Sequence, residues 1–217
     1  MKQNRREERV GYMKNKYLTC MMMGIALSIL LLSGCNFFNH EIGKMKEALK
    51  GREAIIQTYD EESNVIDRIE GKSISIGSED KFAEKDGEGN TTKKSSVLSL
   101  TIGGESVVHV GSSLILYEKD LTNVFEEYAK TVDVQNMDRS IPFVNRMVND
   151  MKNITTGKSK VILIRSQSGK PLATFVGDNV SYFATDIDKS TGILIDGKYL
   201  FIYRCDYTIY DASLLQS

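Results

Sequence analysis

Histidine and cysteine, which often supply catalytic bases, nucleophiles and metal ligands, are scarce in this sequence. There are two histidines, His40 and His109, and three cysteines, at positions 20, 35 and 205. Nucleophilic catalysis needs a Ser, Thr or Cys with a base in hydrogen-bonding reach, and neither His109 nor Cys205 lies in a recognisable catalytic motif. We predict no catalytic residues and expect Cys205 to be a buried, unreactive thiol. A dyad of His109 and Cys205 is the one catalytic alternative.

Nucleotide-binding and metal-binding motifs are also missing. Gly-Lys-Ser occurs at residues 71–73 and 157–159, but Ile66 and Lys152 replace the glycine that a phosphate-binding loop needs five positions earlier. The acidic stretch 185–192 alternates carboxylates as a calcium loop does, yet it lacks the glycine and the final acid of that pattern. We therefore predict no metal site and no cofactor.

The N-terminus has the layout of an export signal. Basic residues precede an uncharged run at residues 17–33, as in the n-region and h-region of a signal peptide. The run is shorter than the roughly 20 residues of a spanning helix, so we expect cleavage after residue 34. An uncleaved membrane anchor is the alternative. Met1 and Met13 are both compatible with the start of this signal.

The end of the signal carries a specific resemblance. Leu32, Ser33, Gly34 and Cys35 resemble the lipobox of bacterial lipoproteins, in which a signal peptidase cuts before the cysteine. The resemblance implies a diacylglyceryl group on the Cys35 thiol, and two acyl chains suffice for stable membrane attachment. We expect a lipid-anchored protein on the extracytoplasmic face of the cell membrane, with residues 35–51 as the lipidated tether.

The charge of the mature chain argues against an anionic partner. Six of the 28 basic and two of the 29 acidic residues leave with residues 1–34, so 22 basic residues face 27 acidic ones, a net charge near −5. Nucleic acid and anionic lipid select for a basic face. We predict no nucleic-acid partner. A single cysteine, Cys205, remains beside the acylated one, so there is no disulfide framework.

Two parts of the mature chain resemble each other. Residues 55–76 align without gaps on residues 161–182, which pairs Gly71 with Gly177, and residues 102–118 align on residues 195–211, which pairs Ile102 with Ile195. Two matched blocks in the same order indicate a duplicated unit. Chance similarity between two hairpin-rich segments is the alternative.

Both units read as strands, because β-branched and aromatic runs alternate with turn residues. We predict a mainly β (α+β) fold with one compact domain at residues 52–217, in which two related meanders form a sandwich or a distorted barrel. Unit 1 covers residues 52–119 with a mobile charged loop at 78–96, a helical connector covers 120–158, and unit 2 covers 159–217. In the connector, Phe143, Met147 and Met151 form an apolar stripe at helical spacing.

Aromatic residues alternate near the C-terminus. We expect one strand to span residues 199–211 and to place the rings of Tyr199, Phe201, Tyr203 and Tyr207 on one face. Such rings can stack on sugar or peptide and are our candidate ligand-binding residues. Core packing is the alternative, because Leu200 and Ile202 on the opposite face are apolar too.

The strand and turn pattern that follows the lipobox resembles a family of uncharacterised bacterial lipoproteins, mostly from Gram-positive species, defined as a domain of unknown function. The pattern comprises residues 59–76, 97–121 and 192–215. The resemblance implies a location on the outer leaflet facing the cell wall and brings no catalytic residues. We expect a non-enzymatic envelope lipoprotein that binds a protein or a wall component. A small-ligand carrier comes next, followed by a wall-active enzyme.

Overall fold

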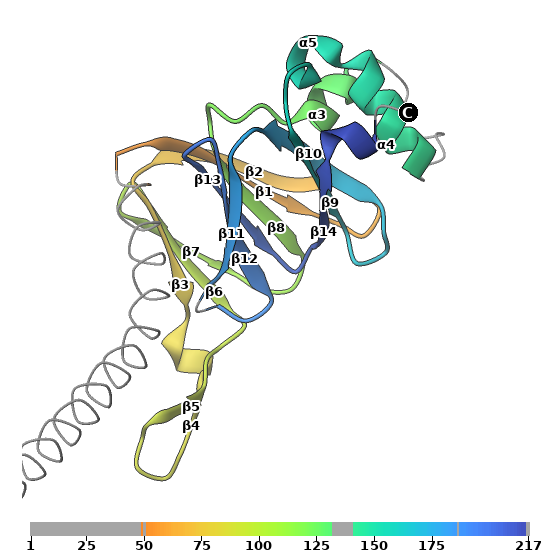
Figure 1. Ribbon diagram of the computed structural model, residues 1–217. Coiled ribbons are helices and arrows are strands. Elements are labelled where there is room, and N and C mark those ends of the chain that lie inside the picture. Colours follow the sequence, from red (N-terminus) through yellow and green to blue (C-terminus); the bar gives the residue numbers. More distant parts are fainter. Residues whose placement is uncertain (1–48, 50, 132–140, 186, 216–217) are drawn as a thin grey trace, which may run out of the picture. The chain divides into compact units, whose positions relative to one another are not determined.

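The computed structural model describes Leu49 and residues 51–131, 141–185 and 187–215 (Figure 1). All of them belong to the unit Ile42–Ser217. The predicted signal peptide, its residues Leu32, Ser33 and Gly34, and the lipidation site Cys35 lie outside this part of the chain. Leu49, near the end of the predicted tether, is described and is buried in the core.

The mainly β prediction is confirmed. The described strands form antiparallel sheets of six, three, three and two strands, and none of them closes into a barrel. The first repeat contains β1 (Glu53–Tyr59), β2 (Val65–Lys72), β3 (Ile74–Ser78), β6 (Leu98–Ile102), β7 (Glu105–His109) and β8 (Ser113–Glu118). The second repeat contains β9 (Lys160–Arg165), β10 (Pro171–Gly177), β11 (Val180–Ala184), β12 (Ser190–Ile195), β13 (Lys198–Tyr203) and β14 (Asp206–Asp211).

The strands of the two repeats pair in the same order. In the first repeat β1 pairs with β2 and β8, and β6 pairs with β3 and β7. In the second repeat β9 pairs with β10 and β14, and β12 pairs with β11 and β13. Each repeat is therefore a pair of three-stranded sheets, and the six strands of one correspond to the six strands of the other.

Two glycines mark the same close approach in both repeats. A Cβ on Gly71 would lie 2.3 Å from Ile102 Cγ2, and a Cβ on Gly177 would lie 2.4 Å from Ile195 Cγ2. These are the same glycine and isoleucine pairs that the internal alignment of the sequence matches. Only a residue without a side chain fits beneath each isoleucine, which explains why glycine stands at both positions.

The repeats are joined edge to edge by β8 and β13. These strands pair antiparallel and merge three strands of each repeat into the six-stranded sheet, in the order β11-β12-β13-β8-β1-β2. Glu118 is buried at the end of this junction, where its Oε1 accepts a hydrogen bond from the Tyr199 backbone N–H at 2.9 Å. Its Oε2 accepts from Arg52 Nη1 at 2.8 Å. Glu118 thus ties the two repeats together.

The other two three-stranded sheets cover the two faces of this six-stranded sheet. The sheet β3-β6-β7 packs on one face and buries Ile56, Leu100 and Phe201 in a first core. The sheet β10-β9-β14 packs on the other face and buries Ile115 and Phe175 in a second core. The chain therefore stacks three β layers, which Figure 1 shows from the side.

The predicted connector forms short helices that cover the outer face of the sheet β10-β9-β14. They are α3 (Val124–Ala129), α4 (Ile141–Asp150) and α5 (Lys152–Thr155), and α3 has Asn123 as its N-cap. The predicted stripe of Phe143, Met147 and Met151 is buried in a third core, against Val161 and Leu163 of β9. The helices stand at one end of the stack of layers (Figure 1).

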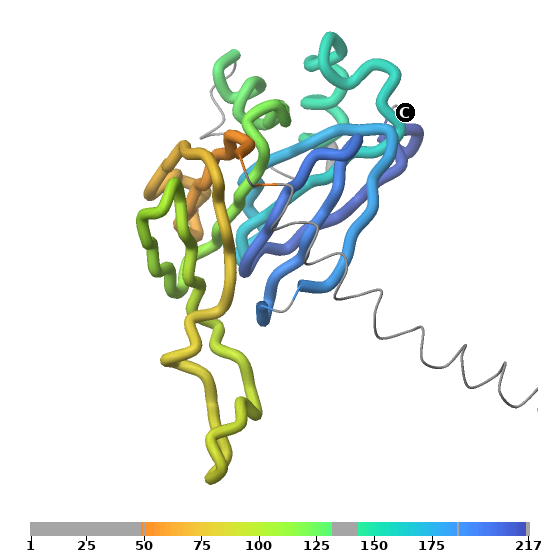
Figure 2. Tube along the Cα trace, turned by 90° about the vertical axis from the view of Figure 1, so that its left-hand side faces the viewer, coloured from red at the N-terminus to blue at the C-terminus, as the bar shows by residue number. Residues whose placement is uncertain are grey.

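The charged loop at 78–96 is largely a β-hairpin. A 3-10 turn, η1 (Asp80–Phe82), leads into β4 (Glu84–Lys85) and β5 (Thr91–Lys93), which extend away from the packed sheets (Figure 2). Asp86 organises the turn because its carboxylate accepts from the backbone N–H of Glu88 and of Asn90 at 3.0 and 2.8 Å. The Asn90 hydrogen bonds hold the pKa of Asp86 below its usual value. The charged loop therefore contains a short hairpin, and its mobility stays a prediction.

The expectation of one continuous strand over residues 199–211 was also wrong. The chain breaks after Tyr203, where Arg204 has a φ of +52°, so β13 belongs to the six-stranded sheet and β14 to the sheet β10-β9-β14. A positive φ is uncommon for a residue other than glycine and does not occur in a regular strand. A second short 3-10 turn, η2 (Ala212–Leu214), follows β14.

The glycine positions yield a stability test. We expect Gly71→Ala and Gly177→Ala each to lower the free energy of unfolding by about 1–3 kcal/mol, because the added methyl group collides with an isoleucine in a packed sheet. Gly77→Ala is the matched control, since its Cβ would meet nothing within 4 Å. Urea denaturation of the three variants measures the difference. Equal stability of all three would contradict the close approach.

The junction yields a second test. We expect Glu118→Ala to lower the free energy of unfolding by roughly 2 kcal/mol, because it removes a buried, charge-assisted acceptor from the Tyr199 N–H. Glu118→Gln keeps an acceptor oxygen and should cost less. Glu53→Ala, which removes a half-exposed carboxylate paired with Lys72 and Lys119, should change stability little. Thermal unfolding of the three variants gives this order, and a silent Glu118→Ala would refute the role of Glu118.

Candidate functional site

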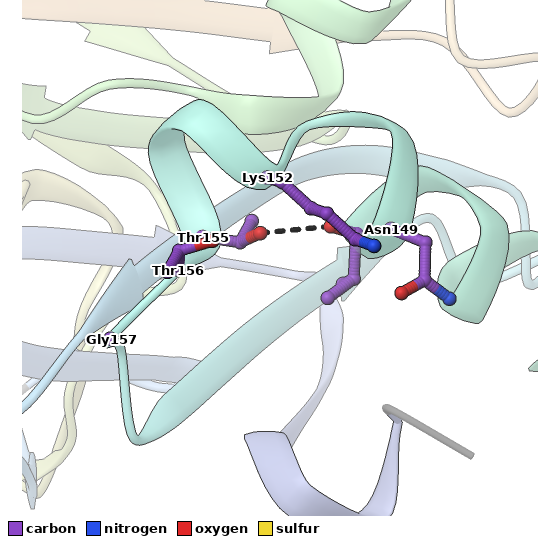
Figure 3. A pocket seen from close by; sticks show the side chains of 6 residues that line it. Asn149, Lys152, Thr155, Thr156 and Gly157 are labelled. Atoms are coloured by element: carbon purple, nitrogen blue, oxygen red, sulfur yellow. Dashed lines mark hydrogen bonds between the residues drawn. The ribbon is translucent and has the colours of Figure 1, made fainter.

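Two of the hollows on the described surface lack the features of a built site. One of about 360 Å³ lies at α4 and α5, where Asn149 and Lys152 are exposed (Figure 3). Its buried hydroxyl, Thr155 Oγ1, already donates to the Val148 carbonyl at 2.8 Å. Another of about 450 Å³ lies between β5 and the β11–β12 turn, and there Lys93 pairs with Glu84 at 2.9 Å. Most of the residues that line these two hollows are exposed.

A third hollow is smaller but lies inside the first repeat, between its two sheets. It has a volume of about 100 Å³. Its floor is buried and apolar, and Thr58, Asp67 and His109 bring polar groups to it, with Thr58 Oγ1 donating to Asp67 Oδ2 at 3.1 Å. The lining residues are Ile56, Thr58, Asp67, Ile69, Leu100, Val107, Val108, His109 and Leu114. We call this hollow the β7 cavity, because β7 contributes three of its residues.

Comparison of the repeats explains why this space exists. The internal alignment matches Ile69 with Phe175 and Thr58 with Ile164. Phe175 and Ile164 are buried in the second core. His109 corresponds in the same way to Ile202. The first repeat therefore carries smaller or polar side chains where the second repeat carries large apolar ones.

In the second repeat, a strand from outside the repeat also helps to fill the core. Ile115 and Tyr117 of β8 are buried in the second core, and the Tyr117 ring lies 5.1 Å from the Phe175 ring. Burial raises the pKa of Tyr117 to about 12. The β7 cavity lies at the corresponding place of the first repeat. There β13 contributes Phe201 and Tyr203 to the first core, but no described strand pairs with β7 to fill the cavity as β8 does beside β13.

β7, the strand beside which such side chains would enter the cavity, has an open edge. β13 pairs with β12 on one side and with β8 on the other, whereas its counterpart β7 pairs with β6 alone among the strands that the structure describes. The outer face of β7 exposes Val108, and Val110, which directly follows the strand, is exposed as well, at 55% and 65% of their surface. Unpaired strand edges offer backbone N–H and C=O groups to another chain.

His109 has a structural environment in addition to its place at the cavity. One ring nitrogen, Nε2, lies 2.9 Å from the Ser112 carbonyl oxygen, and the ring meets Tyr203 edge-on at 5.9 Å. Cys205 makes other contacts, since its Sγ lies 3.2 Å from the Tyr203 carbonyl oxygen. Burial raises the pKa of the Cys205 thiol to about 12. A thiol with so high a pKa is protonated at neutral pH and is a poor nucleophile.

The candidate aromatic residues do not share one face. Tyr199, Phe201 and Tyr203 are buried in the first core, and the Tyr203 hydroxyl donates to the Ser96 carbonyl at 2.5 Å. Tyr207 lies on β14 and packs against the second core. The break at Arg204 separates the two sets. In the structure, the three rings of β13 pack inside the protein and do not form a surface for stacking.

The open edge and its cavity were missed by reasoning from the sequence. Val108 and Val110 read as ordinary strand residues, and nothing in their own segment marks an edge. The alignment of the repeats held the signal, because it places these valines opposite Phe201 and Tyr203. A valine at the counterpart of a buried aromatic residue indicates that the first repeat lacks a neighbour there.

The described ranges hold neither a metal-binding cluster nor a membrane-spanning helix. No cluster of three or more His, Cys, Asp or Glu side chains could hold a metal ion there. No helix in the same ranges has the length and apolar character needed to cross a membrane.

The thiol environment is directly testable. In a full chain with Cys20→Ser and Cys35→Ser, we expect Cys205 to react with Ellman's reagent at pH 8 much more slowly in the native state than in urea, because burial keeps it protonated. Adding Val108→Cys supplies an exposed thiol that should react at once, as the control. Rapid labelling of native Cys205 would contradict the buried, protonated state.

Comparison with known proteins places the chain in a family. The family model described as Domain of unknown function (DUF5052) matches residues 16–215. No curated protein and no solved structure matches the chain. Because the family match covers nearly the whole sequence, the chain belongs to this family of domains of unknown function.

Proposed function

We propose that this protein is a lipid-anchored, non-enzymatic binding module of the bacterial cell envelope. Its β domain would stand on the extracytoplasmic face of the membrane and bind another envelope protein. The observation that carries the binding role is the open edge of β7, where Val108 on the strand and Val110 directly after it are exposed. The counterpart of β7 in the second repeat, β13, is paired on both sides.

The sequence of the N-terminus supports the location. Residues 32–35 form a lipobox-like tetrad at the end of an export signal, and two acyl chains on Cys35 would hold the domain at the membrane. Together with the resemblance to Gram-positive lipoproteins, this favours a cell with a single membrane. The domain would then face the cell wall.

The geometry favours a binding module over an enzyme. The Cys205 thiol is partly buried with a raised pKa, and its hydrogen bonds and those of His109 go to different backbone carbonyls. A nucleophile and its base should be within hydrogen-bonding reach of each other. The contacts of Cys205 and His109 are those of structural residues and not those of a nucleophile and its base.

The size of the β7 cavity argues against this cavity as a small-ligand site, and the two larger hollows are lined mostly by exposed residues. Ligand pockets usually enclose about 300–1,000 Å³, whereas this cavity has about 100 Å³. Such a space accommodates one or two side chains and is too small for a sugar or a nucleotide. A protein is therefore the better partner.

Lipidation is tested first by intact-mass analysis of the membrane fraction. We expect the wild-type chain to begin at Cys35 and to carry a diacylglyceryl-sized mass, because the lipobox directs both steps. Cys35→Ala should abolish processing and the added mass, whereas Cys20→Ala, inside the signal, should retain both. A wild-type chain that keeps residues 13–34 would instead show a transmembrane anchor and refute lipidation.

The binding role is tested by crosslinking in the native host. Val108→Lys with Val110→Lys should remove a specific crosslinked partner, because it places charges on the open edge. Val65→Lys with Ile66→Lys is the matched control, since these residues expose 48% and 55% of their surface on another edge strand, β2. An identical crosslink pattern for both double variants would refute binding through β7.

A further inference from the structure

We propose that the first repeat is completed by an extended strand from a partner protein, which pairs antiparallel with β7 and inserts two apolar side chains into the β7 cavity. This inference rests on the proposed binding function and specifies its mode. Addition of a strand to a sheet edge is an established form of recognition, in which backbone hydrogen bonds give affinity and pockets for alternate side chains give specificity.

The second repeat supplies the template for this complex. There β8 lies beside β13, with Tyr117 opposite Leu200, Leu116 opposite Phe201 and Ile115 opposite Ile202. In the alignment of the repeats, these three β13 positions correspond to Val107, Val108 and His109 of β7. The incoming strand should therefore place residues equivalent to Tyr117, Leu116 and Ile115 opposite those three.

The template also fixes which side chains enter the cavity. Ile115 and Tyr117 point into the second core, whereas Leu116 points to the opposite face and into the first core. Val107 and His109 line the β7 cavity. The residues opposite them would project into that cavity, and the residue between them would cover the exposed Val108. The expected partner segment has bulky apolar residues two positions apart.

The helices exclude a second copy of the chain as the occupant in this geometry. The counterpart of β8 in the second repeat is β14, so equivalent pairing between copies would join β14 of one copy to β7 of the next. The first repeat of the next copy would then lie on the outer face of the sheet β10-β9-β14. The helices α3 and α4 already cover that face through Tyr128, Phe143 and Met147. A separate strand has no such conflict.

A peptide with the sequence of residues 113–120, SLILYEKD, is the direct probe, because it contains the strand that completes the second repeat. We expect saturable binding of the fluorescein-labelled peptide to the full chain, measured by polarisation. A control peptide with the counterparts of Ile115 and Tyr117 changed to Ser keeps the backbone and loses both inserted side chains. It should bind at least about tenfold more weakly, which corresponds to 1.4 kcal/mol.

The register is tested by disulfide trapping. The full chain with Cys20→Ser, Cys35→Ser and Val108→Cys should crosslink to a peptide with cysteine at the counterpart of Leu116, because directly opposed strand residues have Cα atoms within disulfide range. A peptide with cysteine at the counterpart of Ile115 should not crosslink, since that side chain points to the other face.

Three results would overturn the proposal: no saturable binding, equal binding of the parent and control peptides, or crosslinking without preference for the predicted position. Disulfide-linked dimers of the Val108→Cys chain, formed without peptide, would assign the edge to a second copy instead. If β7 binds its partner in another way, the peptide does not bind, but Val108→Lys with Val110→Lys still removes the crosslinked partner in the native host. The failure of this inference is therefore distinguishable from the failure of the proposed function.

Discussion

The antiparallel pairing of β8 with β13 is the interaction on which the rest of the structure depends. It makes one six-stranded sheet out of two repeats, and that sheet supplies both faces on which the outer sheets pack. Because side chains alternate across a strand, β8 sends Leu114 and Leu116 into one core and Ile115 and Tyr117 into the other. Each repeat thus helps to build the core of its neighbour, so separation of the pair would leave both cores incomplete.

The sequence predicts those features that depend on local patterns. Alternating apolar residues and turn residues predict the strands, the spacing of Phe143, Met147 and Met151 predicts a buried helix face, and the matched glycines mark equivalent close approaches. The break at Arg204 was missed, because arginine rarely adopts positive φ. The alignment of the repeats did contain this information, since it places Arg204 opposite Gly111, whose φ is +101°. The sequence indicates the positive φ in the first repeat, where the residue is glycine, but not in the second repeat, where it is arginine.

The candidate site could not be predicted from individual residues, because it is defined by a missing neighbour. Val107, Val108 and His109 have unremarkable strand character, and their significance comes from the order of strands in two sheets. That order depends on contacts between segments far apart in the chain, which patterns with a period of two residues do not encode. Burial of Tyr203 beside His109 likewise follows from packing between the repeats. Three of the four predicted ligand-binding rings, those of β13, are therefore core residues, and the candidate site lies at the edge of β7.

The two ends of the stacked layers differ in a way that physical principles of repeat proteins explain. Terminal repeats expose faces that would otherwise contact the next repeat, and they need caps to remain soluble. At the end of the second repeat, α3 and α4 cover the apolar outer face of β9 with Tyr128, Phe143 and Met147. At the other end, the outer face of the sheet β3-β6-β7 is mostly small and polar, with Ser99, Thr101 and Ser106, so most of it is stable in water without a cap. Val108 and Val110 depart from this polar surface, and they do so on the edge strand beside the cavity. On this sheet the exposed apolar side chains lie at the edge beside the cavity, a position that is better explained by a partner strand than by an incomplete cap.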